Sequence, residues 1–219
     1  MRKLCILAIT VLFAFGLMGC GSSGAGKAEP KAEPAATEKA QAAPKSKILV
    51  AYFSISGHTK TLAENTAKAL GADIYEIRPE KPYTSDDLNY NDENTRATVE
   101  QKNDQARPAL ADKNANIGGY ETIIIAHPIW WGQAPRIIDT FVESYDFTGK
   151  NVTNICTSGG SDIGSSGDHL QGITRGKANW KKGKLFNPSA SENDIKSWFD
   201  GLGIKWWPSG KVLNNNEIF

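Results

Sequence analysis

The sequence predicts an α/β protein with three layers, an α/β/α sandwich around a five-stranded parallel sheet. From Lys47 onward, short runs rich in β-branched and other apolar residues alternate about five times with helix-like stretches. Such alternation is typical of a parallel sheet with helical crossovers. The first run, KILVAYFS at 47–54, is apolar almost throughout, as expected of a central strand that helices cover on both faces.

The individual elements follow from local signals. Strands are expected at 47–54, 73–77, 121–127, 150–157 and 182–187. Helices are expected at 58–70, about 92–106, 134–145, 167–173 and 191–203. Gly71 marks the end of the first helix, Pro108 follows the second, and Pro135 stands near the start of the third. Residues 47–204 should therefore form one domain.

The first twenty residues have the pattern of an export signal. Arg2 and Lys3 precede the apolar segment 4–18, which ends in LMGC at Cys20 and resembles a bacterial lipoprotein signal. We therefore predict a signal peptide over 1–19 and lipidation of Cys20, which would hold the protein to a cell membrane on its extracytoplasmic side. A short membrane anchor or an ordinary secretory signal is the alternative, although the apolar run is shorter than the roughly 20 residues of a spanning helix.

Two further segments flank the predicted domain. Residues 20–46 are rich in Ala, Pro, Lys and Glu and contain no large apolar residue, so we expect a flexible linker without a core. An extended spacer of this length reaches up to roughly 80 Å, at about 3.1 Å per residue. In the tail 205–219, Trp206 and Trp207 are expected to pack back onto the sandwich, with a contact to the ligand cleft or to a second copy as the alternative.

Cysteine content and charge exclude several classes of function. Cys5 leaves with the signal and Cys20 carries lipid, so Cys156 has no disulfide partner and is expected to be a buried apolar residue rather than a redox group. Residues 48–219 hold 18 Lys and Arg against 21 Asp and Glu. This weak acidic balance argues against binding to nucleic acid and gives no strong field for steering a charged partner.

The loop after the first strand has the composition of a phosphate site. SISGHTK at 54–60 supplies hydroxyl groups and a glycine directly before a predicted helix. The free N–H groups at a helix start bind anions, and Gly57 allows close approach of the backbone. The spacing matches neither a Walker loop nor a GxGxxG motif. Ordinary capping of the helix by these residues is the alternative interpretation.

Two more loops follow strands that end at the same edge of the predicted sheet. HPIWWGQAP at 127–135 contains Trp130 and Trp131, and because adjacent side chains of a strand point in different directions, at least one ring should be free to stack on a flat ligand. TSGGSDIGSSG at 157–167 is rich in glycine and hydroxyl groups, so its backbone can pass close to a heterocycle.

Together the three loops resemble those of the flavodoxin family over about residues 46–204. The resemblance implies a flavodoxin-like fold and one noncovalently bound FMN. It implies a phosphate loop formed by Ser54, Ser56, Gly57, His58 and Thr59. It also implies two loops that frame the isoalloxazine, formed by Pro128, Ile129, Trp130, Trp131 and Gly132 and by Thr157, Ser158, Gly159 and Gly160. The sequence departs from the family at Ala126-His127, where Gly-Tyr is common, and at His58, where a small polar residue is common.

Other chemistries find little support in the sequence. A GxSxG elbow is absent, because the segment around Ser158 lacks the first glycine. The three histidines, His58, His127 and His169, have no paired spacing, so we predict neither a metal site nor a catalytic acid or base of the protein itself.

The resemblance implies two classes of use for the flavin. The first is electron transfer with a redox partner protein, and the second is an FMN-dependent NAD(P)H:quinone or azo reductase with a small planar acceptor such as a quinone. Extracytoplasmic anchoring favours electron transfer, because the soluble NAD(P)H pool is absent there. A lipoprotein that keeps the fold only for partner binding is a third alternative.

Overall fold

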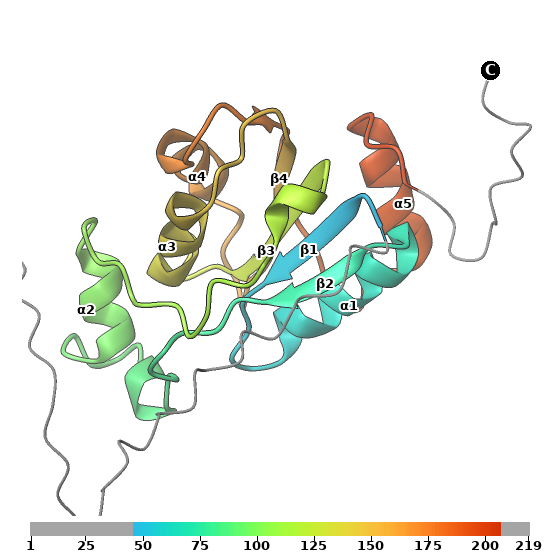
Figure 1. Ribbon diagram of the computed structural model, residues 1–219. Helices are drawn as coiled ribbons and strands as arrows, with labels where there is room; N and C mark the ends of the chain where they lie inside the picture. The colour runs from blue at the N-terminus through green and yellow to red at the C-terminus, as the bar shows by residue number, and fades with distance from the viewer. Residues whose placement is uncertain (1–45, 207–219) are drawn as a thin grey trace, which may run out of the picture. The chain divides into compact units, whose positions relative to one another are not determined.

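The structure, a computed structural model, describes residues 46–206 and is built around one parallel sheet (Figure 1). Its strands are β1 (Ile48–Tyr52), β2 (Asp73–Glu76), β3 (Thr122–Pro128), β4 (Asn151–Thr157), β5 (Asn179–Trp180) and β6 (Lys184–Leu185). The strand order is β2-β1-β3-β4-β5, with β6 also paired to β4. All of these pairs are parallel, which confirms the predicted fold class.

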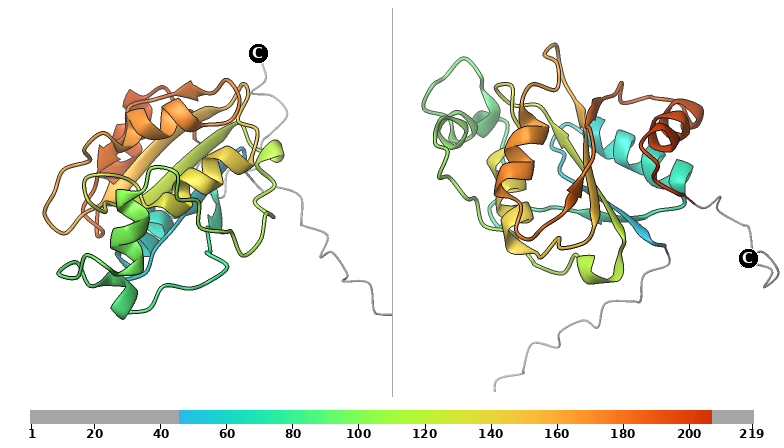
Figure 2. Two further views of the ribbon diagram at one scale, coloured as in Figure 1. Left: turned by 90° about the vertical axis from the view of Figure 1, so that its left-hand side faces the viewer. Right: turned by 90° about the horizontal axis from the view of Figure 1, so that it is seen from above.

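Helices cover both faces of the sheet (Figure 2). On one face lie α1 (His58–Leu70) and α5 (Glu192–Gly201), which contact each other. On the other face lie α3 (Arg136–Ser144) and α4 (Ser166–Ile173), also in contact. The segment between β2 and β3 adds the short helices η1 (Asp86–Leu88), α2 (Arg96–Lys102) and η2 (Ile117–Gly119).

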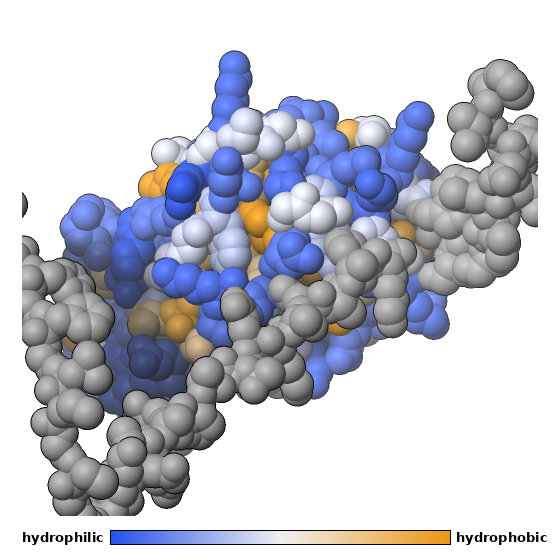
Figure 3. Space-filling model, in the orientation of Figure 1, coloured by the Kyte–Doolittle hydropathy of each residue, from blue (hydrophilic) through white to orange (hydrophobic). Residues whose placement is uncertain are grey.

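The hydrophobic core consists of two clusters, one on each face of the sheet. Ile123 and Ile125 of β3 pack with Phe141 of α3 in the first cluster, whereas Ile124 packs with Phe199 of α5 in the second. The alternation along β3 follows from the opposite orientation of successive strand residues. Burial of each such side chain contributes about 1.5–3 kcal/mol. The face shown in Figure 3 is largely hydrophilic, with small apolar patches.

The predicted fifth strand, 182–187, is wrong in its extent. Two short strands, β5 and β6, occupy this edge position beside β4, and residues 181–183 separate them. The break lies where the backbone at Gly183 meets the buried side chain of Asn154: a Cβ there would lie 2.2 Å from Asn154 Oδ1. The second helix also starts later than predicted, because Asn94 N donates to Asp92 Oδ1 (2.8 Å) and forms a turn before α2.

Several predicted features fall partly or wholly outside the described residues. These are the signal peptide 1–19, Cys20, the linker 20–46 apart from Ser46, and tail residues 207–219. Trp206 is described and packs against the α1–α5 cluster, and its Nε1 donates to Asp200 Oδ1 (2.6 Å), so the prediction for this residue is confirmed. Cys156 is fully buried, and burial raises the pKa of its thiol to about 12. Across residues 46–206, no helix has the length and apolar character needed to cross a membrane.

Candidate functional site

The first loop, residues 53–57, leaves β1 and leads directly into α1. Gly57 is the N-cap of α1 and adopts a left-handed conformation with φ of 89°, which glycine reaches without steric cost. Its N–H donates to Ser54 Oγ (3.2 Å). No side chain caps α1, and its first turn contains no acidic residue. The helix therefore presents its positive dipole end and its first N–H groups to any anion at this edge.

The polar side chains of the first loop differ in exposure. Ser56 and His58 are exposed, and their Oγ and Nδ1 atoms lie 3.4 Å apart. Thr59 is buried, and its hydroxyl lies 2.8 Å from that of Thr157 at the end of β4. Thr59 thus joins the first loop to the third, whereas Ser56 remains accessible.

The second loop, residues 129–135, contains a tight turn that separates the two tryptophans. Trp130 and Gln133 exchange two backbone hydrogen bonds of 2.9 and 3.0 Å, and Trp131 and Gly132 between them have φ of 47° and 74°. Two positive φ values define a type I′ turn. A left-handed conformation is unfavourable for a bulky residue such as tryptophan. The chain holds Trp131 in this conformation at the edge where the ligand is expected.

The two indole rings have different environments, as predicted, although both tryptophans follow β3 and the turn separates them. Trp130 is buried and makes edge-to-face contacts with Phe53 and Tyr83, at centroid distances of 5.6 and 5.3 Å. The Trp131 side chain, by contrast, is 41% exposed. Trp131 therefore has the ring available for stacking, whereas Trp130 packs in the core beneath the second loop.

Tyr90 is an addition to the site that the sequence did not reveal. Its ring lies 4.6 Å from that of Trp131, tilted by 39°. Tyr90 belongs to the inserted segment between η1 and α2, about forty residues before Trp131 in the chain. No local pattern marks this tyrosine, because the contact depends on how the inserted segment folds back. Both rings are exposed, Tyr90 by 55% and Trp131 by 41%.

The third loop, residues 158–165, is organised by its own hydroxyl groups. Ser158 Oγ accepts from Gly160 N (3.2 Å) and Ser161 N (2.9 Å). Beside Gly159 and Gly160 the space is open, because a Cβ there would meet no atom within 4 Å. The third loop also contacts the second: Gln133 Nε2 donates to Ser165 Oγ (2.5 Å).

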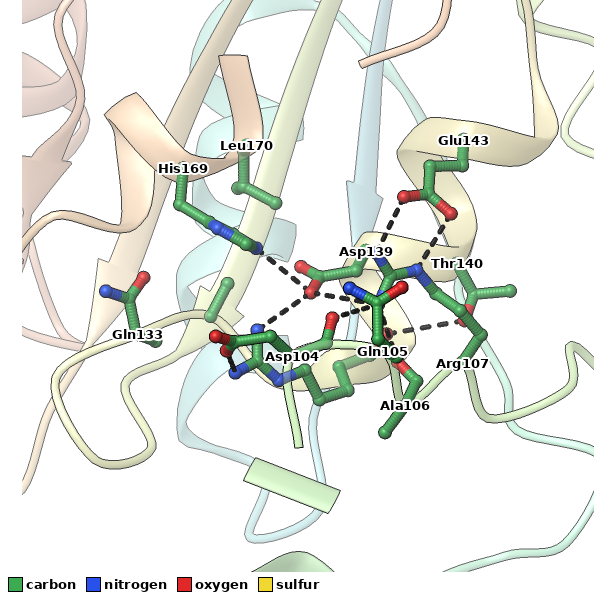
Figure 4. Close-up of polar contacts among 12 residues, drawn as sticks. Asp104, Gln105, Ala106, Arg107, Gln133, Asp139, Thr140, Glu143, His169 and Leu170 are labelled. Atoms are coloured by element: carbon green, nitrogen blue, oxygen red, sulfur yellow. Dashed lines mark hydrogen bonds and ion pairs between the residues drawn. The ribbon is translucent and has the colours of Figure 1, made fainter. Parts of the chain in front are cut away.

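A charged cluster lies behind the second loop, between α3, α4 and the segment after α2 (Figure 4). Asp139 of α3 is fully buried, and its Oδ2 accepts from His169 Nε2 (3.0 Å) and Arg136 (3.1 Å). Arg107 makes a bidentate pair with Glu143 (2.7 and 2.8 Å), which lowers the pKa of that carboxyl. The cluster ties the helix after the second loop to α4, which follows the third loop.

The structure thus brings the three predicted loops together at the carboxyl edge of β1, β3 and β4. The assignment of individual residues to a cofactor stays a prediction. The Cys156 thiol is fully buried with a raised pKa, so it is not a reactive nucleophile. The edge offers an anion site and an exposed aromatic ring, which suits a ligand with a phosphate and a flat heterocycle.

The strand order, the open helix start and the ligand edge define a flavodoxin-like α/β protein. The flavodoxin family model matches residues 47–202, and the chain belongs to this family. A provisionally named flavoprotein from Bacteroides eggerthii DSM 20697 is 44% identical, with a TM-score of 0.68 over 73% of this chain and 99% of that one.

Two further comparisons complete this finding. A second provisionally named flavoprotein, from Bacteroides uniformis ATCC 8492, is also 44% identical, with a TM-score of 0.65 over 71% of this chain and 98% of that one. A flavoprotein from Lactobacillus acidophilus NCFM, solved in complex with FMN, is 19% identical with a TM-score of 0.53 over 70% of this chain and 98% of that one. This last likeness shows the fold alone. No curated protein matches the chain.

Proposed function

We propose that this protein binds one FMN noncovalently and serves as a membrane-tethered electron carrier. The observation that carries the proposal is the pairing, at one sheet edge, of an uncapped α1 start with the exposed ring of Trp131. The Lactobacillus acidophilus flavoprotein of the same fold was solved with FMN, which supports the choice of flavin.

The residues present fit this cofactor. A Cβ built at Gly57, Gly159 or Gly160 would meet no atom within 4 Å, so the backbone there leaves room for a ligand. The start of α1, with Ser54 and Ser56, would hold the phosphate. Trp131 and the third loop would hold the ring. The flavin, when bound, supplies the redox chemistry, and the protein supplies binding and electrostatics.

Titration of the flavin-free full-length chain with FMN and with riboflavin tests the proposal. Riboflavin lacks the phosphate and reports on the contacts of the ring and its ribityl chain. We expect FMN to bind more tightly than riboflavin, because it gains the α1 contacts. The absence of binding by calorimetry and by flavin fluorescence would contradict the proposal.

Membrane tethering through Cys20 and export of the domain are part of the same proposal. They are supported by the sequence pattern at 1–20 and the polar segment 21–46. Fractionation of cells that express the wild type and Cys20→Ala tests them. The wild type should follow the membrane and be cut by added protease, and Cys20→Ala should not be membrane-bound. A protease-shielded cytoplasmic wild type would contradict tethering.

A second candidate function is an FMN-dependent NAD(P)H:quinone or azo reductase. The exposed rings of Trp131 and Tyr90 favour it, because they offer a surface for a planar acceptor. Mixing the FMN-loaded protein with NADPH or NADH under anaerobic conditions separates the two functions. Rapid bleaching of the flavin supports the reductase. Reduction only by a protein or artificial one-electron donor supports the carrier.

A further inference from the structure

Buried hydrogen bonds form a continuous chain beneath the second and third loops. The chain consists of His127 at the end of β3, Asn154 in β4 and Ser166 at the start of α4, all with no exposed surface. His127 Nδ1 lies 2.9 Å from Pro128 O, and His127 Nε2 lies 3.2 Å from Asn154 Nδ2. Asn154 Nδ2 lies 3.3 Å from Ser166 Oγ, which donates to Ile163 O (2.8 Å).

One arrangement of hydrogens satisfies every link of this chain. Neutral His127 donates from Nδ1 to Pro128 O and accepts at Nε2. The Asn154 amide donates one hydrogen to His127 Nε2 and the other to Ser166 Oγ. The Ser166 hydroxyl in turn donates to Ile163 O. Burial lowers the pKa of His127 to about 4, so the neutral form is present at pH 7. Asn154 Oδ1 has no partner among the described residues.

The fold makes room for this chain at two glycines. A Cβ at Gly183 would lie 2.2 Å from Asn154 Oδ1, and a Cβ at Gly167 would lie 3.1 Å from it. The hydrogen bond of His127 also supplies a partner for a backbone group at the end of β3. Pro128 has no N–H and ends β3, and the His127 ring satisfies the last carbonyl of the strand.

The two ends of the chain lie on different loops. Pro128 leads into the second loop, which carries Trp131, and Ile163 lies within the third loop. At the surface the same loops meet again, where a Cβ on Gly164 would lie 2.2 Å from Gly132 O. The second and third loops are therefore joined at the surface, where Gln133 Nε2 also donates to Ser165 Oγ, and through the core.

We propose that His127, Asn154 and Ser166 are positioning residues that hold the second and third loops in one relative arrangement for the flavin ring. The inference rests on the proposed function, in which the ring lies between these loops. These three side chains would act on the ring only through the backbone carbonyl groups of Pro128 and Ile163, on which the hydrogen bonds end. Breaking it should weaken ring binding and leave the phosphate contribution of the first loop unchanged.

The test uses the full-length protein with three single variants and the Ser166→Ala/His127→Asn double variant. Ser166→Ala removes the hydroxyl that connects Asn154 to Ile163 O in the third loop. His127→Asn keeps a donor for Pro128 O but loses the hydrogen bond to Asn154. Thr153→Val is the matched control, because Thr153 is equally buried in β4 and its Oγ1 donates to Lys182 O (2.9 Å), outside the chain.

We expect Ser166→Ala and His127→Asn each to weaken riboflavin and FMN by the same factor, about tenfold. The double variant should lose little more than one single variant, since either change breaks the same chain. Thr153→Val should change stability but not flavin affinity. Equal affinities for all variants, or losses no larger than that of Thr153→Val, would overturn the inference.

Amide hydrogen exchange of the flavin-free protein tests the chain independently of flavin binding. In a Ser165→Ala background, which lacks the hydrogen bond from Gln133 Nε2 to Ser165 Oγ, Ser166→Ala should speed exchange of the Gln133 N–H, which donates to Trp130 O in the second loop (3.0 Å), because the buried hydrogen bonds couple the two loops. If the wild type binds neither flavin, the proposed function fails and this measurement alone decides the inference. Unchanged exchange in the second loop would overturn the inference.

Discussion

The hydroxyl of Thr59 lies 2.8 Å from the hydroxyl of Thr157, although 98 positions separate the two residues. Thr59 lies in the first turn of α1 and Thr157 ends β4, and both are almost fully buried. The pair therefore joins the first loop to the third, as the His127 chain joins the second to the third. All three ligand loops are connected to one another below the surface.

Replacing Thr59 tests this connection. Thr59→Val keeps the shape of the side chain but leaves the Thr157 hydroxyl without its partner, so we expect the free energy of unfolding to fall by about 1–2 kcal/mol. Urea denaturation of the flavin-free protein measures the change. Thr59→Ser is the control and should retain most of the stability. Equal stability of Thr59→Val and wild type would show that the hydroxyl pair contributes nothing.

The phosphate and the ring should respond to different residues. Ser56 is exposed beside the uncapped start of α1, so Ser56→Ala should weaken FMN several-fold and leave riboflavin unchanged. Trp131→Ala removes the stacking surface and should weaken both ligands by about tenfold. Isothermal titration of the two flavins distinguishes these patterns. Equal effects of Ser56→Ala on FMN and riboflavin would argue against a phosphate at this loop.

The buried His127 should make stability depend on pH. Its pKa is about 4 in the folded protein, against 6.5 ordinarily, because burial disfavours the charged form. Above pH 6.5 both states are neutral at this residue and the contribution is complete. As the pH falls from 6.5 towards 4, only the unfolded chain takes up a proton, and stability falls by up to about 3 kcal/mol.

Urea denaturation at pH 7.5 and pH 5 measures this dependence. His127→Asn has no titrating ring, so its stability should fall less between the two pH values than that of the wild type. The comparison removes the contributions of all other titratable groups, which both proteins retain. Identical pH slopes in the two proteins would contradict a neutral, buried His127.

The pattern of the sequence accounts for the framework of the fold more than for the details of the site. The strand β1 and the helix α1 follow from a continuous apolar run and from Gly71, whose φ of 62° ends the helix. Both signals are local. The Tyr90–Trp131 contact and the break between β5 and β6 depend on distant parts of the chain. Nothing in the sequence around Asn154 indicates that its side chain lies against Gly183 at this break. The sequence predicted that the two tryptophans diverge, but only packing decides that Trp131 is the exposed one.

The charged cluster behind the second loop should contribute to stability through Asp139. This carboxylate is fully buried and pairs with His169 and with the buried Arg136. Asp139→Ala leaves the buried Arg136 guanidinium with the exposed Asp104 as its remaining carboxylate partner, and we expect a loss of roughly 3–5 kcal/mol. Glu143→Gln is the comparison, because its pairing with Arg107 is more exposed and should be worth less than about 1 kcal/mol. Thermal unfolding of both variants checks the contrast, and losses of equal size would contradict the buried role of Asp139.

The strained turn at Trp131 leads us to predict opposite effects of one substitution on stability and on flavin binding. Trp131 has φ of 47° and Gly132 follows it in a type I′ turn, for which Asn-Gly is the favoured pair. In a Tyr90→Ala background, which removes the ring in contact with Trp131, Trp131→Asn should raise the free energy of unfolding of the flavin-free protein by about 1 kcal/mol. The same change should abolish most of the riboflavin affinity, because no ring remains to stack. Chemical denaturation and flavin titration of Tyr90→Ala and of the Tyr90→Ala/Trp131→Asn double variant measure both effects. If Trp131→Asn lowered the stability, the turn would not be strained, and if it left riboflavin binding intact, Trp131 would not be the ring that holds the flavin.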